Sequence, residues 1–284
     1  MKIFITGAGG MLGIDLIQEL GRTYEVSGAN AQECDVTDYY QVSEVISNQK
    51  PDVIIHTAAY TDVDGAEVHQ ERAFKVNAEG ARNVALVARE VGAKLYHIST
   101  DYVFGGAKKM PYVEDDPPNP LGVYAKSKLQ GEEEVQKHLQ NYLIIRTAWL
   151  YGKHGDNFVK SILRLAQTTD TLRVVNDQIG SPTYTKDLCW GIEKLLALEV
   201  SAQKDITGIL HLTNSGSCSW YEFTLAILKY ANLPNVQVLP ISTTQLRRPA
   251  PRPYYSVLSN AKFKMITGYE MRPWEAGLKE YLSS

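Results

Sequence analysis

The first twenty residues constrain the fold of this chain more than any other stretch. Lys2–Thr6 is a short apolar run with the residue types of a β-strand. Glycine then occupies every third position of Gly7–Gly13, and an amphipathic helix is predicted to continue to about Leu20. A strand that enters a helix through such a loop lets backbone N–H groups approach a pyrophosphate at the positive end of the helix. This order predicts a dinucleotide-binding domain of the Rossmann type.

Each glycine of the loop has a separate task in such a domain. Gly7 allows the tight turn, Gly10 lets the backbone approach the phosphates, and Gly13 permits close contact between helix and strand. The residues predicted to contact the dinucleotide here are Gly7, Gly10, Met11, Leu12 and Gly13.

The end of the second predicted strand bears on the choice between NAD and NADP. An acidic residue there binds the ribose hydroxyls of NAD, whereas a basic residue suits the additional phosphate of NADP. Ser27–Asn30 contains neither type. Asp35 and Val36, roughly 20 residues past the loop, are expected near the adenine instead. The sequence therefore leaves the preference between NADPH and NADH open.

Composition excludes several other classes of protein. The chain has 284 residues, of which 44% are hydrophobic and 21% charged, and this suffices for one large domain or two lobes. A net charge of −3 provides no basic field for nucleic acid. With neither a secretory leader nor an apolar run of about 18 residues, the chain is expected to be cytoplasmic and without a membrane partner. The three widely spaced cysteines predict neither a disulfide framework nor a metal site.

Apolar runs alternate with helical patterns along much of the chain. One continuous helix is predicted over 66–91. Further strands are predicted at 52–56, 94–98, 142–146 and 208–213. The alternation predicts an α/β fold, a Rossmann-type doubly wound parallel sheet with a smaller, discontinuous α/β substrate-binding lobe. The expected division gives the dinucleotide-binding domain residues 1–146 and 184–213, and the second lobe residues 147–183 and 214–284.

Small residues follow the strand predicted at 52–56. They would let the ribose and phosphates of a dinucleotide lie close to the backbone, so Ala58, Ala59 and Tyr60 are predicted contacts. His56 ends the same apolar strand and is interpreted as a structural histidine.

Two polar segments carry further predictions. Asn77, inside the helix predicted over 66–91, is expected to hold a backbone group or a water molecule near Lys128, with a surface or capping role as the alternative. Residues 111–120 combine four prolines with acidic side chains and are predicted to form a stiff, solvated loop ahead of the helix that carries Tyr124.

Thr100, Tyr124 and Lys128 indicate acid–base chemistry. Thr100 ends a predicted buried strand, and residues four apart on a helix share a face, so Lys128 lies beside Tyr124. An ammonium group favours the phenolate and is expected to lower the pKa of Tyr124, which suits proton transfer to or from a carbinol oxygen. The spacing Tyr-x-x-x-Lys arises about once by chance in a chain of this composition, so its weight depends on the other motifs.

The order of six motifs is more specific than any one of them. They are Gly7–Gly13, Ser99–Phe104, Tyr124-x-x-x-Lys128, Arg146–Gly152, Asp177–Thr183 and Arg252–Ser256. Together they resemble the extended short-chain dehydrogenase/reductases, and within that group the dTDP-4-dehydrorhamnose reductases. The resemblance spans nearly the whole chain, with a small departure in the residues between Tyr124 and Lys128.

This resemblance implies a role for each matching residue. Tyr124 would be the general acid, Lys128 would hold the nicotinamide ribose and tune Tyr124, and Thr100 would orient the substrate oxygen. Trp149 would line the sugar pocket and Arg252 would face the diphosphate, although the residues alone fit equally well a core tryptophan and a surface ion pair. The residues expected at the substrate are Thr100, Tyr102, Phe104, Tyr124, Trp149 and Arg252.

The implied reaction is reduction of the C4 ketone of dTDP-4-dehydro-L-rhamnose by NADPH or NADH. One alternative is a nucleotide-sugar epimerase or dehydratase of the same superfamily. Another is a non-catalytic dinucleotide-binding protein, like the regulatory subunit of methionine adenosyltransferase that shares this fold. The implied partner is a nucleotide sugar, the expected state is a monomer or a homodimer, and no metal ligands are predicted, although some relatives form magnesium-bridged dimers.

Overall fold

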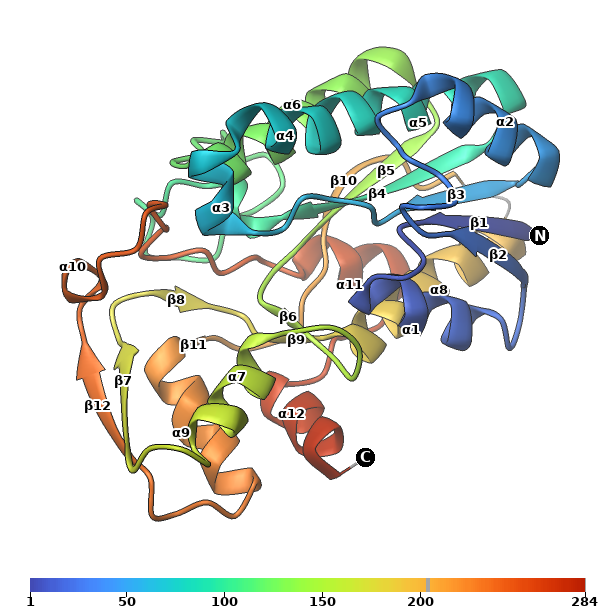
Figure 1. Cartoon of the computed structure of the whole chain (residues 1–284). Helices are drawn as coiled ribbons and strands as arrows, with labels where there is room; N and C mark the ends of the chain where they lie inside the picture. The colour runs from blue at the N-terminus through green and yellow to red at the C-terminus, as the bar shows by residue number, and fades with distance from the viewer. Residues whose placement is uncertain (203–204, 284) are drawn as a thin grey trace.

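A six-stranded parallel sheet forms the centre of the larger lobe in the computed structural model, which describes residues 1–202 and 205–283. Figure 1 shows this sheet between two layers of helices. The strand order is β10-β5-β4-β3-β1-β2, and all neighbours are parallel. The strands are β1 (Lys2–Thr6), β2 (Glu25–Ala29), β3 (Val53–His56), β4 (Lys94–Thr100), β5 (Tyr142–Thr147) and β10 (Gly208–His211). The predicted doubly wound fold is confirmed.

Helices cover both faces of the sheet because successive strand residues point to opposite sides. Ile3 and Ile5 of β1 belong to one hydrophobic cluster and Phe4 to another. The first cluster is covered by α1 (Met11–Leu20) and α8 (Thr185–Ala202). The second is covered by α2 (Tyr39–Gln49), α5 (Gly80–Val91) and α6 (Val123–His138).

A smaller lobe has a hydrophobic cluster of its own, which includes Tyr151, Phe223 and Trp274. Its helices are α7 (Phe158–Leu165), α9 (Trp220–Tyr230) and α12 (Trp274–Ser283). Its parallel strand pairs are β7 (Thr171–Val175) with β12 (Gln237–Ile241) and β6 (Leu150–Tyr151) with β9 (Thr183–Tyr184). An antiparallel pair joins β8 (Ile179–Gly180) to β11 (Cys218–Ser219), and α10 spans Thr243–Leu246.

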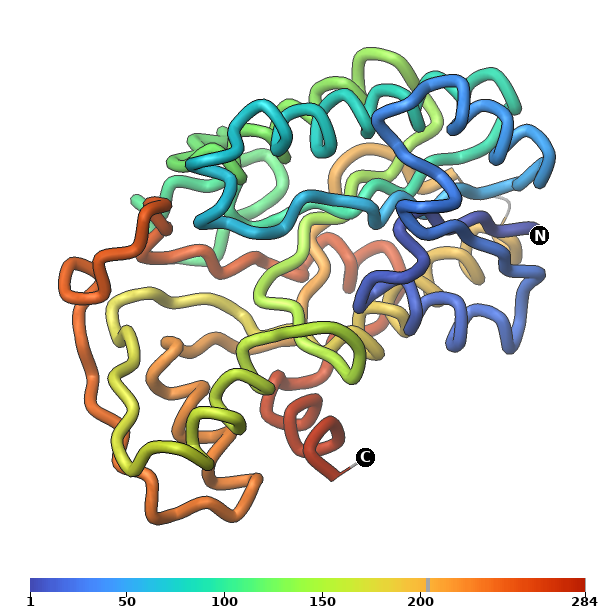
Figure 2. Tube along the Cα trace, viewed as in Figure 1, coloured from blue at the N-terminus to red at the C-terminus, as the bar shows by residue number. Residues whose placement is uncertain are grey.

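The chain passes between the two lobes more than once, as the trace in Figure 2 shows. In one of these passages, α11 (Ala261–Thr267) returns to the sheet, where Phe263 and Met271 pack in the cluster under α8, and α12 then lies in the smaller lobe again. Segments far apart in sequence therefore build each lobe. The boundaries expected for the two domains, which also take in residues 203, 204 and 284 outside the described part of the chain, stay a prediction.

The single helix predicted over 66–91 is wrong. The structure has α3 (Val63–Val68) and α4 (Gln70–Phe74), then a π-helical turn at Lys75–Glu79 that continues into α5. The break between α3 and α4 falls at His69, whose φ of −108° and ψ of 52° are not helical. The periodicity missed the π-turn because one additional residue in a turn leaves the apolar spacing on either side intact.

The loop at 111–120 is anchored rather than simply solvated. Tyr112 is buried, and its ring stacks on Phe104 with centroids 4.2 Å apart. The carboxylate of Glu114 accepts a hydrogen bond from the backbone N–H of His211 at 2.9 Å. Proline and acidic residues predicted exposure correctly for part of the loop, but the ring of Tyr112 and the carboxylate of Glu114 fix the loop to the rest of the protein.

Candidate active site

A cleft of about 1650 Å³ runs along the carboxyl ends of the sheet strands and reaches into the smaller lobe. Ligands of parallel α/β sheets bind at this edge. The predicted residues that line its sheet side are Gly7, Gly10, Met11, Leu12, Gly13, Asp35, Val36, Ala58 and Ala59. Those that line it near the smaller lobe are Thr100, Tyr102, Tyr124, Lys128, Trp149 and Arg252. Three other predicted residues lie outside this lining, namely Tyr60, Asn77 and Phe104.

The glycine loop fits tightly against the segment that follows β3. Gly7 has a left-handed φ of 71°, and a Cβ added there would lie 2.6 Å from the backbone nitrogen of Ala58. A Cβ on Gly13 would lie 2.3 Å from the carbonyl oxygen of Gly7. Gly10 begins α1 and donates its N–H to the same carbonyl at 2.9 Å. Side chains are thus excluded at Gly7 and Gly13, and the backbone can meet a pyrophosphate at the start of α1.

Thr100, Tyr124 and Lys128 meet where β4 ends and α6 begins. Thr100 is the last residue of β4, and its hydroxyl donates to the carboxylate of Asp101 at 3.1 Å. Its side chain also lies close enough to Tyr124 to lower the pKa of the phenol. One helical turn after Tyr124, the Nζ of Lys128 donates to the carbonyl oxygen of Ile98 at 2.6 Å. The structure therefore brings together the three side chains that the sequence singled out.

Burial controls the protonation of Tyr124 and Lys128. It raises the pKa of Tyr124 to about 12, although the nearby side chain of Thr100 lowers this pKa in part. The lowered phenol pKa expected from the sequence is therefore wrong, because desolvation of the phenolate outweighs other effects. Burial also lowers the pKa of Lys128 to about 8, against the opposing attraction of Glu132.

Asn77 holds the backbone of Tyr60 and also binds Ser127 of α6. Its Oδ1 accepts from the N–H of Tyr60 at 2.8 Å, and its Nδ2 donates to the carbonyl of Tyr60 at 3.1 Å and to the hydroxyl of Ser127 at 2.9 Å. The Ser127 hydroxyl in turn donates to the carbonyl oxygen of Tyr124. The prediction that Asn77 holds a backbone group is confirmed, and the π-turn turns this amide inward.

A buried ion pair behind Lys128 was missed from the sequence. The carboxylate of Glu132, fully buried on α6, binds the guanidinium of Arg146 on β5 with a shortest distance of 2.7 Å. It also accepts from the hydroxyl of Ser99 at 2.5 Å. The available signal was the i, i+4 spacing of Lys128 and Glu132, which places both on the face that meets the sheet.

His56 is structural, as its sequence context indicates. Its Nδ1 lies 2.6 Å from the hydroxyl of Thr6, and its ring stacks against that of His97 with centroids 5.2 Å apart. Burial and the nearby charge of Lys128 lower the pKa of His56 to about 3. The two imidazoles are therefore neutral at physiological pH.

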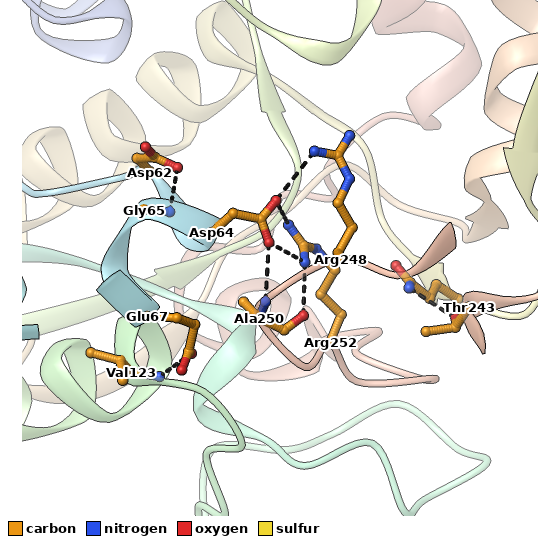
Figure 3. Close-up of polar contacts among 10 residues, drawn as sticks. Asp62, Asp64, Gly65, Glu67, Val123, Thr243, Arg248, Ala250 and Arg252 are labelled. Carbon is orange, nitrogen blue, oxygen red and sulfur yellow. Dashed lines mark hydrogen bonds and ion pairs between the residues drawn. The ribbon is translucent and has the colours of Figure 1, made fainter. Parts of the chain in front are cut away.

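Arg252 is held by Asp64, and both residues line the cleft; Figure 3 shows the pair. Its two terminal nitrogens donate to the two carboxylate oxygens of Asp64, each at 2.9 Å. Arg248 contacts the same carboxylate at 3.3 Å, and its side chain is 58% exposed. Arg252 was predicted as an anion-binding residue, and Asp64, its partner on α3, was not predicted.

Trp149 and Trp220 come from segments far apart in the sequence and stack against each other at the cleft. Their rings are parallel to within 4° with centroids 3.4 Å apart, and both line the cleft. Trp149 has a φ of 47°, and a Cβ on Gly180 would lie 2.4 Å from its ring, so the backbone and the glycine both accommodate this ring position. Trp220 was not predicted, since it lies on a helix remote in sequence.

Phe104 does not face the cleft, contrary to prediction. It is fully buried, stacks on Tyr112, and lies under the guanidinium of Arg146, which is 5.1 Å from the ring centroid. Tyr102, two residues earlier, does line the cleft, and its ring meets the edge of Tyr124 at a centroid distance of 6.1 Å. The short 3₁₀ turn at Asp101–Val103 directs these neighbours apart.

Three features together define an extended short-chain dehydrogenase/reductase. They are the parallel sheet, the glycine loop between β1 and α1, and the group of hydroxyl, phenol and ammonium where β4 ends and α6 begins. A family model described as "RmlD substrate binding domain" matches residues 1–284. The chain belongs to this family, which is the family of the dTDP-4-dehydrorhamnose reductases.

Similar proteins and structures cover nearly the whole chain. The spore coat polysaccharide biosynthesis protein SpsK of Bacillus subtilis is 42% identical, over 99% of this chain and 96% of its own length. The dTDP-4-dehydrorhamnose reductase of Aggregatibacter actinomycetemcomitans is 39% identical, over 98% and 97%. A crystal structure of the Bacillus anthracis dTDP-4-dehydrorhamnose reductase in complex with NADP has a TM-score of 0.94 at 43% identity, with 99% of this chain and 98% of that chain covered. A UDP-glucose 4-epimerase from Thermus thermophilus, at 20% identity and a TM-score of 0.81, shares the fold.

Proposed function

We propose that this protein reduces the C4 ketone of dTDP-4-dehydro-L-rhamnose to dTDP-L-rhamnose with NADPH or NADH. The observation that carries the proposal is that Thr100, Tyr124 and Lys128 meet at the cleft that the glycine loop also lines. The protein is an enzyme of the reductase family to which the chain belongs. The relative crystallised with NADP supports the choice of cofactor.

The residues of the glycine loop fit a dinucleotide. Added Cβ atoms at Gly7 and Gly13 would collide with the backbone, so only glycine fits at these two positions. The absence of side chains lets a pyrophosphate approach the backbone of the loop. Met11, Leu12, Ala58 and Ala59 line the same part of the cleft, and Asp35 and Val36 line it farther out, where the adenosine would lie. Asn77 would act indirectly by holding the backbone of Tyr60. The bound cofactor would supply the hydride.

Tyr124 would donate the proton that the reduced carbonyl oxygen needs. With its pKa raised to about 12 by burial, the phenol is protonated at neutral pH and can donate. Thr100, whose side chain lies close enough to Tyr124 to act on its pKa, would bind the same oxygen and fix its direction. The ammonium of Lys128 would hold the nicotinamide ribose and stabilise the phenolate that proton donation leaves.

The smaller lobe would hold the rest of the nucleotide sugar. Trp149 would pack against the sugar, and Tyr102 lines the same cleft. Arg248 and Arg252 together with Asp64 carry a net charge of +1, from two guanidinium groups and one carboxylate. Such a cluster favours a diphosphate.

In the part of the chain that the structure describes, 1–202 and 205–283, no helix has the length and apolar character needed to cross a bilayer. We place the reaction in the cytoplasm, because substrate and cofactor are both multiply charged and partition poorly into lipid. Whether the protein acts as a monomer or a homodimer stays a prediction.

The test is the loss of nicotinamide absorbance when purified protein is mixed with dTDP-4-dehydro-L-rhamnose and either NADPH or NADH. The proposal expects stoichiometric oxidation, and comparison of the two cofactors ranks them. Cofactor that copurifies with the chain and is not consumed would instead indicate an epimerase or dehydratase. Cofactor binding without any turnover would indicate a regulatory dinucleotide-binding protein.

A further inference from the structure

The short helix α3 uses two carboxylates to contact two segments that lie far apart in the sequence. Asp64 and Glu67 are three residues apart, so both project from neighbouring positions on its surface. Figure 3 shows Asp64 directed toward the arginines at 248 and 252 and Glu67 directed toward Val123. The first partner belongs to the segment after α10, and the second is the first residue of α6.

Glu67 supplies the cap that α6 does not find in its own sequence. The N-cap residue of α6 is Gly122, which has no side chain to accept from the unpaired N–H groups of the first turn. The Oε1 of Glu67 accepts from the N–H of Val123 at 2.8 Å. A Cβ on Gly122 would lie 2.7 Å from this oxygen, so the glycine makes room for the carboxylate. A negative charge at this end of α6 is also favoured by the helix dipole.

Val123 directly precedes Tyr124, so this contact fixes the turn that presents the phenol. A helix end that is held by one hydrogen bond frays when the bond is lost, and its side chains then sample other directions. Glu67 thus restrains Tyr124 through the backbone without touching the substrate.

Asp64 acts on Tyr124 indirectly, through Arg252 and Tyr102. Its carboxylate accepts from both terminal nitrogens of Arg252 and from the backbone N–H of Ala250. Burial raises the pKa of Tyr102, and the charge of Arg252 acts on its hydroxyl to lower this pKa in part. The ring of Tyr102 packs on the edge of Tyr124. Asp64 thereby sets the position of Arg252, whose guanidinium lies beside the aromatic neighbour of the phenol.

We infer that Asp64 and Glu67 make α3 a positioning element for Tyr124, in which Glu67 holds the start of α6 and Asp64 holds the Arg252–Tyr102 side of the same phenol. The inference rests on the proposed role of Tyr124 as proton donor. It assigns Arg252 a role within the protein in addition to any contact with the diphosphate.

The experiment is a double-mutant cycle on single-turnover rates with saturating NADPH and dTDP-4-dehydro-L-rhamnose. Glu67→Ala should slow the reduction by about tenfold or more, since small displacements of a reacting group cost this much, while the Kd for NADPH stays unchanged. Glu67→Gln retains an oxygen acceptor for Val123 and should stay within about threefold of wild type. Glu71→Gln, on the exposed face of α4, is the matched control and should leave the rate unchanged.

The Tyr124→Phe background separates positioning from general damage. If Glu67 acts through the phenol, Glu67→Ala should cost less than about twofold in the residual rate of Tyr124→Phe, because residues that act as a unit are not additive. Asp64→Asn should behave in the same way, with the exposed Asp115→Asn as its control. If Glu67→Ala does not fold, the cycle with Asp64 decides between the two explanations, because the Asp64 carboxylate binds the segment 248–252 and not the start of α6.

Full wild-type rates in both Glu67→Ala and Asp64→Asn would overturn the inference. So would an equal loss in the wild-type and Tyr124→Phe backgrounds, which would show a merely structural effect. Failure of the proposed function has a different signature, because wild-type protein would then not oxidise NADPH, or Tyr124→Phe would be as fast as wild type.

Discussion

Tyr124 and Lys128 lie one turn apart on α6, and burial acts on them in opposite directions. It disfavours the charged form in each case, so it raises the pKa of the phenol to about 12 and lowers that of the ammonium to about 8. The phenol is therefore protonated at neutral pH, whereas the lysine is close to its titration. Each of these states can be tested by itself.

Replacement of Tyr124 by Phe should lower turnover at least about a hundredfold, which is the usual contribution of a positioned general acid. The ring and its packing on Tyr102 are retained, so the Kd for NADPH should change little. Steady-state rates and a fluorescence titration of NADPH measure the two quantities. A variant with wild-type turnover would exclude Tyr124 as the proton donor.

The pH dependence of kcat/KM for the cofactor should report Lys128. Its folded pKa of about 8 lies below the ordinary value, so the charged form is present below pH 8 and is lost as the pH rises through 8. We expect kcat/KM to fall by up to about tenfold per pH unit above this point. In Lys128→Arg, the guanidinium stays charged, so this decline should disappear although the absolute rate is lower. An unchanged decline in that variant would assign it to another group.

The sequence was sufficient to find Thr100, Tyr124 and Lys128 because strand ends and helical spacing are local properties. It failed for Phe104, whose direction depends on a 3₁₀ turn and on the ring of Tyr112 from a later segment. The pKa of Tyr124 was misjudged for a related reason. An ammonium four residues away is visible in a sequence, but the surrounding burial is not.

At the scale of secondary structure, the pair of Glu132 and Arg146 joins α6 to β5 inside the protein. Glu132→Ala would leave a buried guanidinium without its counter-ion, and we expect a loss of roughly 3–5 kcal/mol in the free energy of unfolding. Urea denaturation measures the change. Glu133→Ala on the exposed side of the same helix is the control, with an expected change within about 0.5 kcal/mol. Equal midpoints for the two variants would contradict a stabilising role for the pair.

Long elements were predictable and very short ones were not. Strands such as Val53–His56 are almost unbroken apolar runs, and helices such as Trp220–Tyr230 have apolar residues at helical spacing. The two-residue strands β6, β8, β9 and β11 are too short to show any period. They exist because the crossing segments of the smaller lobe lie side by side, and this is a property of the fold and not of the local sequence.

At the scale of the whole molecule, both lobes contribute to one cleft, so ligands should stabilise the folded protein from each side. NADPH at a hundred times its Kd should add about 2.7 kcal/mol to the free energy of unfolding. Addition of dTDP should raise the melting temperature further, whereas thymidine, which has no diphosphate for Arg248 and Arg252, should have a much smaller effect. Scanning calorimetry with each ligand provides the comparison. Equal shifts with dTDP and thymidine would exclude the arginines from diphosphate binding.

The π-helical turn at Lys75–Glu79 makes this part of the chain sensitive to deletion. The N–H of Gly80 donates to the carbonyl of Lys75, five residues back, so the turn holds one residue more than an α-helical turn. Loss of a single codon here would convert the π-helical turn into an α-helical turn, which leaves α4 and α5 in place but redirects the side chains between them by up to about 100°. Asn77 would then no longer face Tyr60. In-frame deletions in this segment should be far more harmful than substitutions at its exposed positions.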